Sequence, residues 1–449
     1  MLAVGVSSVA AQSTEALLDA NRYTEAIAQL RDGASSGASA ASLGEAHLRR
    51  GYALRDLARL QAALGAAYYT KRDTSAAARS GTTTAYYAAR HRVGTSATGG
   101  EDVLRRLVQS GALPAALQAR AQVWIGWAQY RNGDDAAAQE RWSRASGTST
   151  PAVAADLALA HWRAGEPLPA LHCGADGSGI AALRCRLWAA IRAEDWGRTA
   201  SLQEDLIQKD RPAERSKTFR TEEGETYEIR FYDPGTLRGL AVADFRAAAA
   251  AYRKADRDPA DLLAGLAALE GRDYETARSA LGAAGDTPYR PIYRAVLGEK
   301  TGTPSGTSSL WEKGRQHSSA QIRAVWAQEA SQFATYRKTV QSYCSTQEAP
   351  DNMRMALRLG RAALNAGQSE TAYRLMSGPY PVSRNNDLRV IDPAYLATLA
   401  RAKFRVGPQY ESELLSHLDA LYPRYPVASI AYSLAQGYYV PERTEGLAR

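Results

Sequence analysis

The chain is poor in several residue types that usually mark a function. It has three cysteines, six histidines and four methionines among 449 residues. No run of apolar residues approaches the ~20 positions that a membrane-spanning helix needs, so we expect no transmembrane segment. No two histidines have the spacing of a HExxH zinc site, and no GxxxxGK[ST] or GxGxxG phosphate-binding motif is present. We therefore expect no metal, no cofactor and no catalytic residues, and so not an enzyme.

Lysine is also scarce, which shapes the charge of the chain. Only eight of the 55 basic residues are lysine, so the net charge of +8 comes almost entirely from arginine. The arginines are interleaved with acids, as in Arg49, Arg50, Arg55, Asp56 and Arg59, rather than gathered in blocks. Because nucleic-acid-binding surfaces concentrate basic residues on one face, this scattered pattern predicts a solvated surface and no nucleic-acid partner.

What the chain does have is a repeated arrangement of small residues. Gly126 is followed twelve residues later by Ala138 and four residues after that by Trp142. The same spacing of glycine, alanine and a large apolar residue occurs twice more. The three copies comprise Gly126, Ala138, Trp142, Gly265, Ala277, Leu281, Gly360, Ala372 and Met376. A polar turn lies midway in each copy, so each unit is predicted to be a helix, a tight turn and a second helix.

A glycine inside a helix costs about 0.5–1 kcal/mol relative to alanine, so its recurrence requires a reason. Small residues at the glycine and alanine positions let the two helices of a unit approach closely, and the large apolar residue fills the space beside them. An Asp, Ser or Asn in the turn is expected to accept a hydrogen bond from the free N–H groups that open the second helix. These glycines therefore predict paired, closely packed helices.

The pattern resembles the tetratricopeptide repeat (TPR), whose units follow W-x2-L-G-x2-Y, then A-x3-F, then P over 34 residues. The resemblance implies an all-α fold, a TPR-like α-solenoid of helix-turn-helix repeats. The copies depart from the family pattern: Gln129 stands where Tyr is preferred, and the copies are not whole multiples of 34 residues apart. More degenerate units are expected to fill the intervals.

The resemblance also implies a concave groove lined by the first helix of each unit. Carried over residue by residue, the groove candidates are Arg120, Val123, Trp127, Tyr130, Arg131, Arg354, Leu357, Arg361, Leu364 and Asn365. The middle copy contributes a mostly apolar set, namely Pro259, Leu262, Leu266, Leu269 and Glu270. Trp127 has the alternative role of packing between units. The arginines predict an acidic or carboxylate-ended peptide as the ligand.

The remaining segments complete the predicted organisation. The apolar start of the chain, which ends in Val9-Ala10-Ala11, resembles the end of a secretory signal, although no positive charge precedes it. We expect a signal remnant, four helical segments and one β-hairpin insertion, whose strands are predicted near 217–232 from their alternating pattern. In chain order their bounds are 1–11 (signal remnant), 12–92, 101–210, 211–239 (hairpin insertion), 240–300 and 310–449.

The cysteines and the hairpin leave alternatives open. Cys173 and Cys185 either form a disulfide in an exported protein or remain separate thiols, and the neighbouring His172 is not expected to make Cys173 a nucleophile. The hairpin either covers apolar surface or offers an exposed strand edge to a partner.

These patterns predict a non-enzymatic scaffold or adaptor of the bacterial cell envelope, periplasmic or secreted, that holds a peptide or protein partner in its groove. The alternatives are a peptidoglycan- or carbohydrate-associated binding protein, in which tyrosines and tryptophans stack on sugars, and the support subunit of an enzyme on another chain.

Overall fold

The computed structural model describes residues 13–31, 37–71, 82–95, 99–147, 150–166, 169, 173, 179–209, 216–220, 226–230, 234–255, 259–303, 306–377 and 393–406. The proposed signal remnant at 1–11 and the segment after residue 406 lie outside these residues. The described chain is predominantly α-helical, and its many paired helices are compatible with an α-solenoid. None of its helices is both long and apolar enough to cross a membrane.

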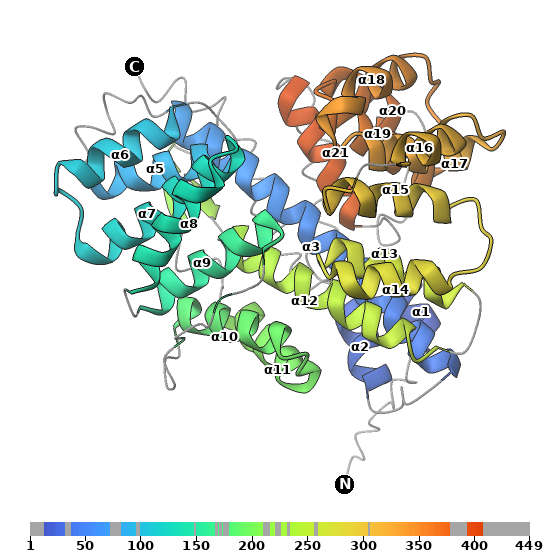
Figure 1. Cartoon of the computed structure of the whole chain (residues 1–449), viewed down its shortest axis with the longest axis horizontal. Coiled ribbons are helices and arrows are strands. Elements are labelled where there is room, and N and C mark those ends of the chain that lie inside the picture. Colours follow the sequence, from blue (N-terminus) through green and yellow to red (C-terminus); the bar gives the residue numbers. More distant parts are fainter. Residues whose placement is uncertain are drawn as a thin grey trace, which may run out of the picture.

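Two lobes of helices flank a central pair of long helices (Figure 1). The central pair consists of α3 (Gly37–Lys71) and α12 (Pro234–Tyr252), which pack against each other. The first two helices are α1 (Thr14–Asp19) and α2 (Tyr23–Arg31). The first lobe contains α5 (Thr82–Thr95), α6 (Gly100–Gln109), α7 (Ala115–Arg131), α8 (Asp135–Ser146), α9 (Pro151–Ala164), α10 (Ile180–Arg192) and α11 (Trp196–Lys209).

The second lobe follows α12 in the chain. It contains α13 (Ala260–Glu270), α14 (Tyr274–Ala283), α15 (Arg290–Lys300), α16 (Thr307–Arg315), α17 (Ala320–Ala330), the 3-10 helix η2 (Ala334–Tyr336), α18 (Arg337–Ser345), α19 (Met353–Asn365), α20 (Ser369–Ser377) and α21 (Pro393–Val406). The late helix α21 contacts the early helix α3, which also contacts α5. The N-terminal segment therefore joins both lobes, and its 35-residue α3 is one continuous helix rather than a helix-turn-helix unit.

The glycines lie where two helices of a pair cross, as predicted. A Cβ placed on Gly126 would come within 2.7 Å of Trp142 Nε1 and 3.2 Å of the Ala138 carbonyl oxygen. A Cβ on Gly265 would meet Leu281 Cγ at 2.7 Å, and one on Gly360 would collide with the Met376 side chain. The three large residues are almost completely buried. The pairs α7–α8, α13–α14 and α19–α20 thus depend on the absence of a side chain at these positions.

The turns of the pairs share one backbone geometry. The residue seven positions after each glycine has a left-handed φ: +86° at Gly133, +54° at Arg272 and +87° at Gly367. In two pairs the residue that follows caps the second helix. Asp134 accepts from Ala137 N at 3.2 Å, and Asp273 accepts from Thr276 N at 3.1 Å. The predicted role of Asp in the turn is confirmed at these two positions.

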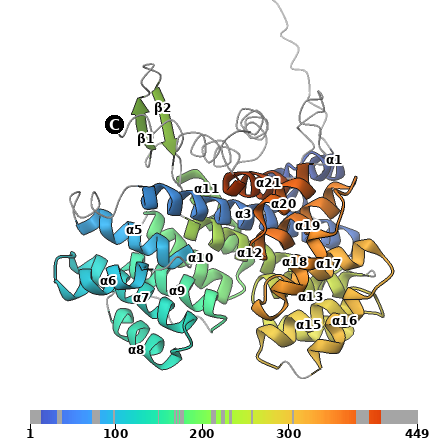
Figure 2. The same cartoon turned by 90° about the horizontal axis from the view of Figure 1, so that it is seen from above.

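Two short strands lie in the segment for which a hairpin insertion is predicted. Strand β1 (Ser216–Arg220) pairs antiparallel with β2 (Thr226–Arg230), and Lys217 lies opposite Ile229. Figure 2 shows the two strands projecting from the helical body. A role of this segment in partner binding remains a prediction.

Cys173 and Cys185 form a disulfide, which decides between the two alternatives left open by the sequence. Cys185 is completely buried in α10 beside Ala154 and Ala155 of α9, so the bond anchors residue 173 to the first lobe. Because Cys173 is disulfide-bonded, it is not a free nucleophile. The remaining cysteine, Cys344, is buried, and burial raises its pKa to about 12.

We expect the disulfide to contribute measurably to stability. A bond that closes a loop between residues twelve positions apart constrains the unfolded chain and contributes about 3 kcal/mol. Cys173→Ser is therefore expected to lower the melting temperature, measured by circular dichroism, to the value that reduced wild-type protein shows. The variant itself should be insensitive to dithiothreitol. Equal melting of oxidised and reduced wild-type protein would contradict a stabilising bond.

Candidate functional site

Four of the five groove candidates of the first copy are buried or half-buried beneath neighbouring helices, and the fifth, Arg131, is exposed. Val123 is completely buried and Trp127 is 9% exposed. The Tyr130 hydroxyl donates to the Ala164 carbonyl oxygen at 2.8 Å, and Arg131 donates to the Val93 carbonyl oxygen at 3.3 Å. Helices α5 and α9 cover this face of α7, and Trp127 takes the alternative role of packing between helices. At this copy, neighbouring helices therefore cover most of the predicted groove and leave Arg131 exposed.

Arg120, the fifth of these candidates, belongs to a buried ionic cluster. Its Nε lies 2.7 Å from a carboxylate oxygen of Asp156, which is completely buried in α9. Asp156 also accepts from Arg90 at 3.0 Å and from Trp124 Nε1 at 3.2 Å, and Arg184 lies 3.6 Å away. Burial alone would raise the pKa of Asp156, but Arg120 and Arg90 outweigh it and lower that pKa. The cluster ties together α5, α7, α9 and α10.

In the third copy the candidates divide between the interior and a pocket. Leu364 is buried, and Asn365 donates to the Ser331 hydroxyl at 3.1 Å, so both serve packing inside the second lobe. Arg354, Leu357 and Arg361 line a pocket with a volume of about 800 Å³. Pro259 and Leu266, from the middle copy, line the same pocket. The structure thus brings together groove candidates from two copies that are far apart in the sequence.

The inner wall of this pocket is built from alternate helices of the second lobe. Residues from α13, α15, α17, α19 and α21 line it, whereas α14, α16, α18 and α20 contribute none. The first helix of each pair therefore faces the pocket, as the resemblance to the tetratricopeptide repeat implies for a groove. The opposite side is formed by α3 together with residues of α1 and α2.

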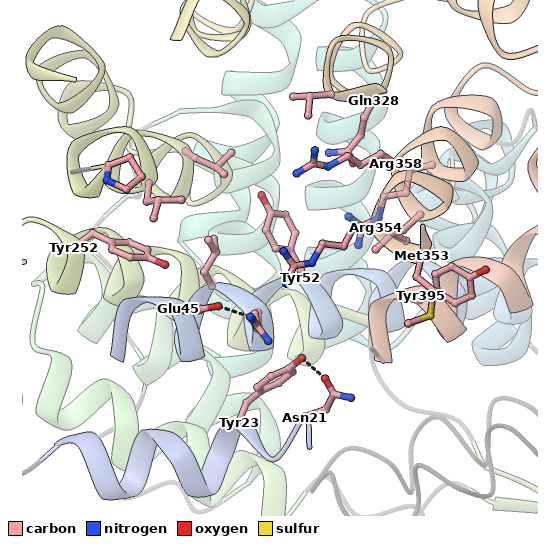
Figure 3. A pocket seen from close by; sticks show the side chains of 18 of the residues that line it. Asn21, Tyr23, Glu45, Tyr52, Tyr252, Gln328, Met353, Arg354, Arg358 and Tyr395 are labelled. Atoms are coloured by element: carbon pink, nitrogen blue, oxygen red, sulfur yellow. Dashed lines mark hydrogen bonds and ion pairs between the residues drawn. The ribbon is translucent and has the colours of Figure 1, made fainter. Parts of the chain in front are cut away.

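Tyrosines and arginines dominate the polar part of the pocket (Figure 3). Tyr52 rises from α3 into the middle of the pocket, Tyr252 lies to one side, and Arg354 and Arg358 enter from α19 on the other side. Tyr23 donates to Asn21 Oδ1 at 2.6 Å and is almost completely buried. Burial raises the pKa of Tyr52, so its hydroxyl stays protonated and can donate or accept a hydrogen bond at neutral pH.

Two of the lining arginines are neutralised by the protein itself. Arg361 forms a buried ion pair with Asp56 of α3, and Arg49 pairs with Glu45 one turn earlier on the same helix. Within the part of the chain that the structure describes, Arg354 and Arg358 have no ion-pair partner, and Arg354 is exposed. These two guanidinium groups are available to a ligand.

The ion pair between Asp56 and Arg361 makes the stability of the protein depend on pH. Burial by itself would raise the pKa of Asp56, but Arg361, Arg55 and Arg59 lower it from 3.8 to about 2. A lowered folded-state pKa means that the unfolded chain takes up the proton first, so this stabilisation is complete above about pH 4 and is lost as the pH falls through about 2.

We expect the free energy of unfolding to decrease by about 2 kcal/mol between pH 4 and pH 2 through the protonation of Asp56, which loses its attraction to Arg361 and the neighbouring arginines. Asp56→Asn should show a shallower decrease over the same pH range, measured by urea unfolding followed by circular dichroism. Glu140→Gln, which alters an exposed pair with Arg144, is the control and should keep the wild-type slope. An unchanged slope in Asp56→Asn would contradict the assignment.

Sequence reasoning missed several residues of the pocket. Arg358 lies on the same face of α19 as Arg354 and Arg361, at i, i+4 and i+7, so its signal was present in "RMALRLGR". Tyr52 and Tyr252 carry no comparable signal because they come from α3 and α12, which do not belong to the matched copies.

The described residues contain no group of three or more His, Cys, Asp or Glu side chains arranged to hold a metal ion. Comparison of the chain with protein families, with curated proteins and with solved structures finds no match.

Proposed function

We propose that this chain is a non-enzymatic binding scaffold of the tetratricopeptide class, and that it holds a peptide segment of a protein partner in the pocket of the second lobe. The observation that carries the proposal is the pocket itself, which the first helices of successive pairs line, and in which Arg354 and Arg358 have no ion-pair partner among the described residues. Its volume of about 800 Å³ is in the range of ligand-binding pockets.

We place the protein in the bacterial cell envelope, periplasmic or secreted. The Cys173–Cys185 disulfide supports this placement, because disulfides form and persist in oxidising compartments. The signal-like start of the chain points in the same direction. The hairpin formed by β1 and β2 is a second surface that a partner can contact through a strand edge.

The test places a larger side chain in the pocket and measures whether the protein still captures its partner. Leu266 lies on α13 and lines the pocket, so Leu266→Trp should obstruct a ligand sterically without changing a charge. Tagged wild-type and variant proteins are used to capture partners from envelope extracts, and captured proteins are compared by quantitative mass spectrometry. We expect a partner that wild-type protein captures to be reduced at least tenfold in Leu266→Trp.

Leu117→Trp is the matched control, because Leu117 is a half-buried residue of α7 in the first lobe and does not line the pocket. It should capture the partner as wild type does. Capture that is equal in all three proteins contradicts the proposed site. Retention of wild-type protein on purified peptidoglycan, with no pocket-dependent protein partner, instead supports the carbohydrate-binding alternative.

A further inference from the structure

The described lining of the pocket carries two positive charges, Arg354 and Arg358, that have no ion-pair partner among the described residues. Arg354 and Arg358 lie four positions apart on one face of α19, where like charges repel each other. Arg354 is also in the first turn of α19, where the helix dipole adds to its positive charge instead of offsetting it. An anion between the two guanidinium groups would remove both unfavourable interactions.

The charges of the pocket are also distributed unevenly. The acidic lining residues, Asp19 and Glu45, come from α1 and α3, on the side opposite α19. Glu45 is already paired with Arg49. A negative group on a ligand would therefore be attracted to the α19 side, and the planar guanidinium groups suit a carboxylate, which they can bind through paired hydrogen bonds.

The pocket wall also carries aliphatic side chains, two of them on α19 beside the arginines in the chain. Leu263 and Leu266 of α13, Val325 of α17 and Leu357 of α19 line the pocket together with Met353. Leu263, Leu266 and Met353 are half-buried and so keep surface that a ligand can cover. This composition suits an aliphatic side chain close to the carboxylate more than it suits a sugar. Four of the five pocket tyrosines, Tyr23, Tyr252, Tyr293 and Tyr395, are at most 7% exposed and so are poor stacking platforms for sugars. The fifth, Tyr52, is half-buried, and its ring is already in contact with the guanidinium groups of Arg55 and Arg361.

The chain's own helix limits the size of the ligand. Helix α3 lies across the inner side of the second lobe and is fixed to α19 by Asp56–Arg361 and to α13 by Arg55–Glu270, whose atoms are 2.6 Å apart. It contacts α12 and α21 as well. A long partner helix therefore has no continuous groove to occupy, and the opening that remains suits a short segment.

We propose that the pocket binds a short peptide segment in which a carboxylate, held between Arg354 and Arg358, lies next to an aliphatic side chain. This inference rests on the proposed function and adds the chemistry of the ligand. Two sources share this chemistry, the α-carboxylate that ends a peptide and the side chain of an internal Asp or Glu.

The experiment uses two probes on the full chain. Acetylated random tetrapeptides with a free C-terminal carboxylate and the same pool with a C-terminal amide are each equilibrated with the protein by dialysis, and bound peptides are identified by mass spectrometry. Enrichment of aliphatic members from the free-acid pool alone identifies the α-carboxylate. Enrichment of Asp- or Glu-containing members in both pools identifies the side chain.

The variants decide whether the two arginines are responsible. Arg354→Gln/Arg358→Gln is expected to weaken binding of an enriched peptide at least tenfold by calorimetry. Arg278→Gln removes an exposed arginine of α14 that does not line the pocket, and it should bind as wild type does. Equal affinity in the double variant, or no enrichment from either pool, overturns the inference.

The carboxylate assignment and the proposed function can be overturned independently of each other. Loss of partner capture in Leu266→Trp, together with full capture in the double arginine variant, would leave the pocket as the binding site and would overturn only the carboxylate assignment. Capture that is indifferent to both changes would remove the site as well.

Discussion

Replacing Gly126 with valine is expected to lower the free energy of unfolding by about 3 kcal/mol or more. Even the first added carbon would come within 2.7 Å of Trp142 Nε1. Trp142 cannot move aside, because it is 2% exposed and its Nε1 donates to the Val123 carbonyl oxygen at 3.1 Å. Overpacking of a filled core forces helices apart or side chains into poor rotamers. Urea unfolding followed by circular dichroism at 222 nm would measure the loss.

The control for this substitution is a helical glycine that faces open space. A Cβ on Gly282 of α14 would have nothing within 4 Å. Gly282→Ala is therefore expected to leave stability unchanged or to increase it by about 0.5–1 kcal/mol, since alanine is the better helix former. If Gly126→Ala were also neutral or stabilising, the close approach of α7 and α8 would not be the reason for glycine at position 126.

Replacing Asp156 with alanine is expected to be of similar severity, at about 3–5 kcal/mol. Asp156 is completely buried and compensates Arg90, Arg120 and Arg184, which come from three different helices. Removing one partner of a buried ionic cluster leaves the others charged and desolvated, and this is far less favourable than breaking an exposed pair. Because the cluster joins the helices of the first lobe, we expect the variant to melt at a lower temperature in differential scanning calorimetry.

Glu140→Ala provides the comparison, since Glu140 pairs with Arg144 on the surface of α8 and both side chains are more than half exposed. Such a pair contributes about 0.2–1 kcal/mol. Nearly equal melting temperatures for Asp156→Ala and Glu140→Ala would show that the buried cluster is not a principal stabilising element of the first lobe.

The repeat pattern allowed the helix pairs to be predicted because their packing is local. The two helices of a unit are joined by a turn of a few residues, so the glycine, the alanine and the large side chain that meet in space also keep a fixed spacing in the chain. The capping roles of Asp134 and Asp273 were predictable for the same reason, because each side chain accepts a hydrogen bond from a backbone N–H only three residues later in the chain.

The groove was predicted only in part. A pattern taken from one unit places Arg120 and Arg354 at equivalent positions, yet Arg120 is engaged by Asp156 inside the first lobe whereas Arg354 is exposed in the pocket. The difference arises from what covers each helix. Helices α5 and α9 close over α7, whereas α3 contacts the corresponding side of α19 through the Asp56–Arg361 ion pair, and Arg354 is exposed and Arg358 half-buried.

By itself, the sequence determined that the chain forms closely packed helix pairs, because the spacing of small and large residues within about seventeen positions dictates that contact. Only the tertiary structure decided which faces of those pairs remain open. The packing of α3 against α12 and α21 joins segments hundreds of residues apart. Its ion pair engages Arg361, whereas Arg354 and Arg358 have no ion-pair partner within the described ranges of the chain. Burial and charge compensation depend on such distant neighbours, which leave no periodic trace in the chain.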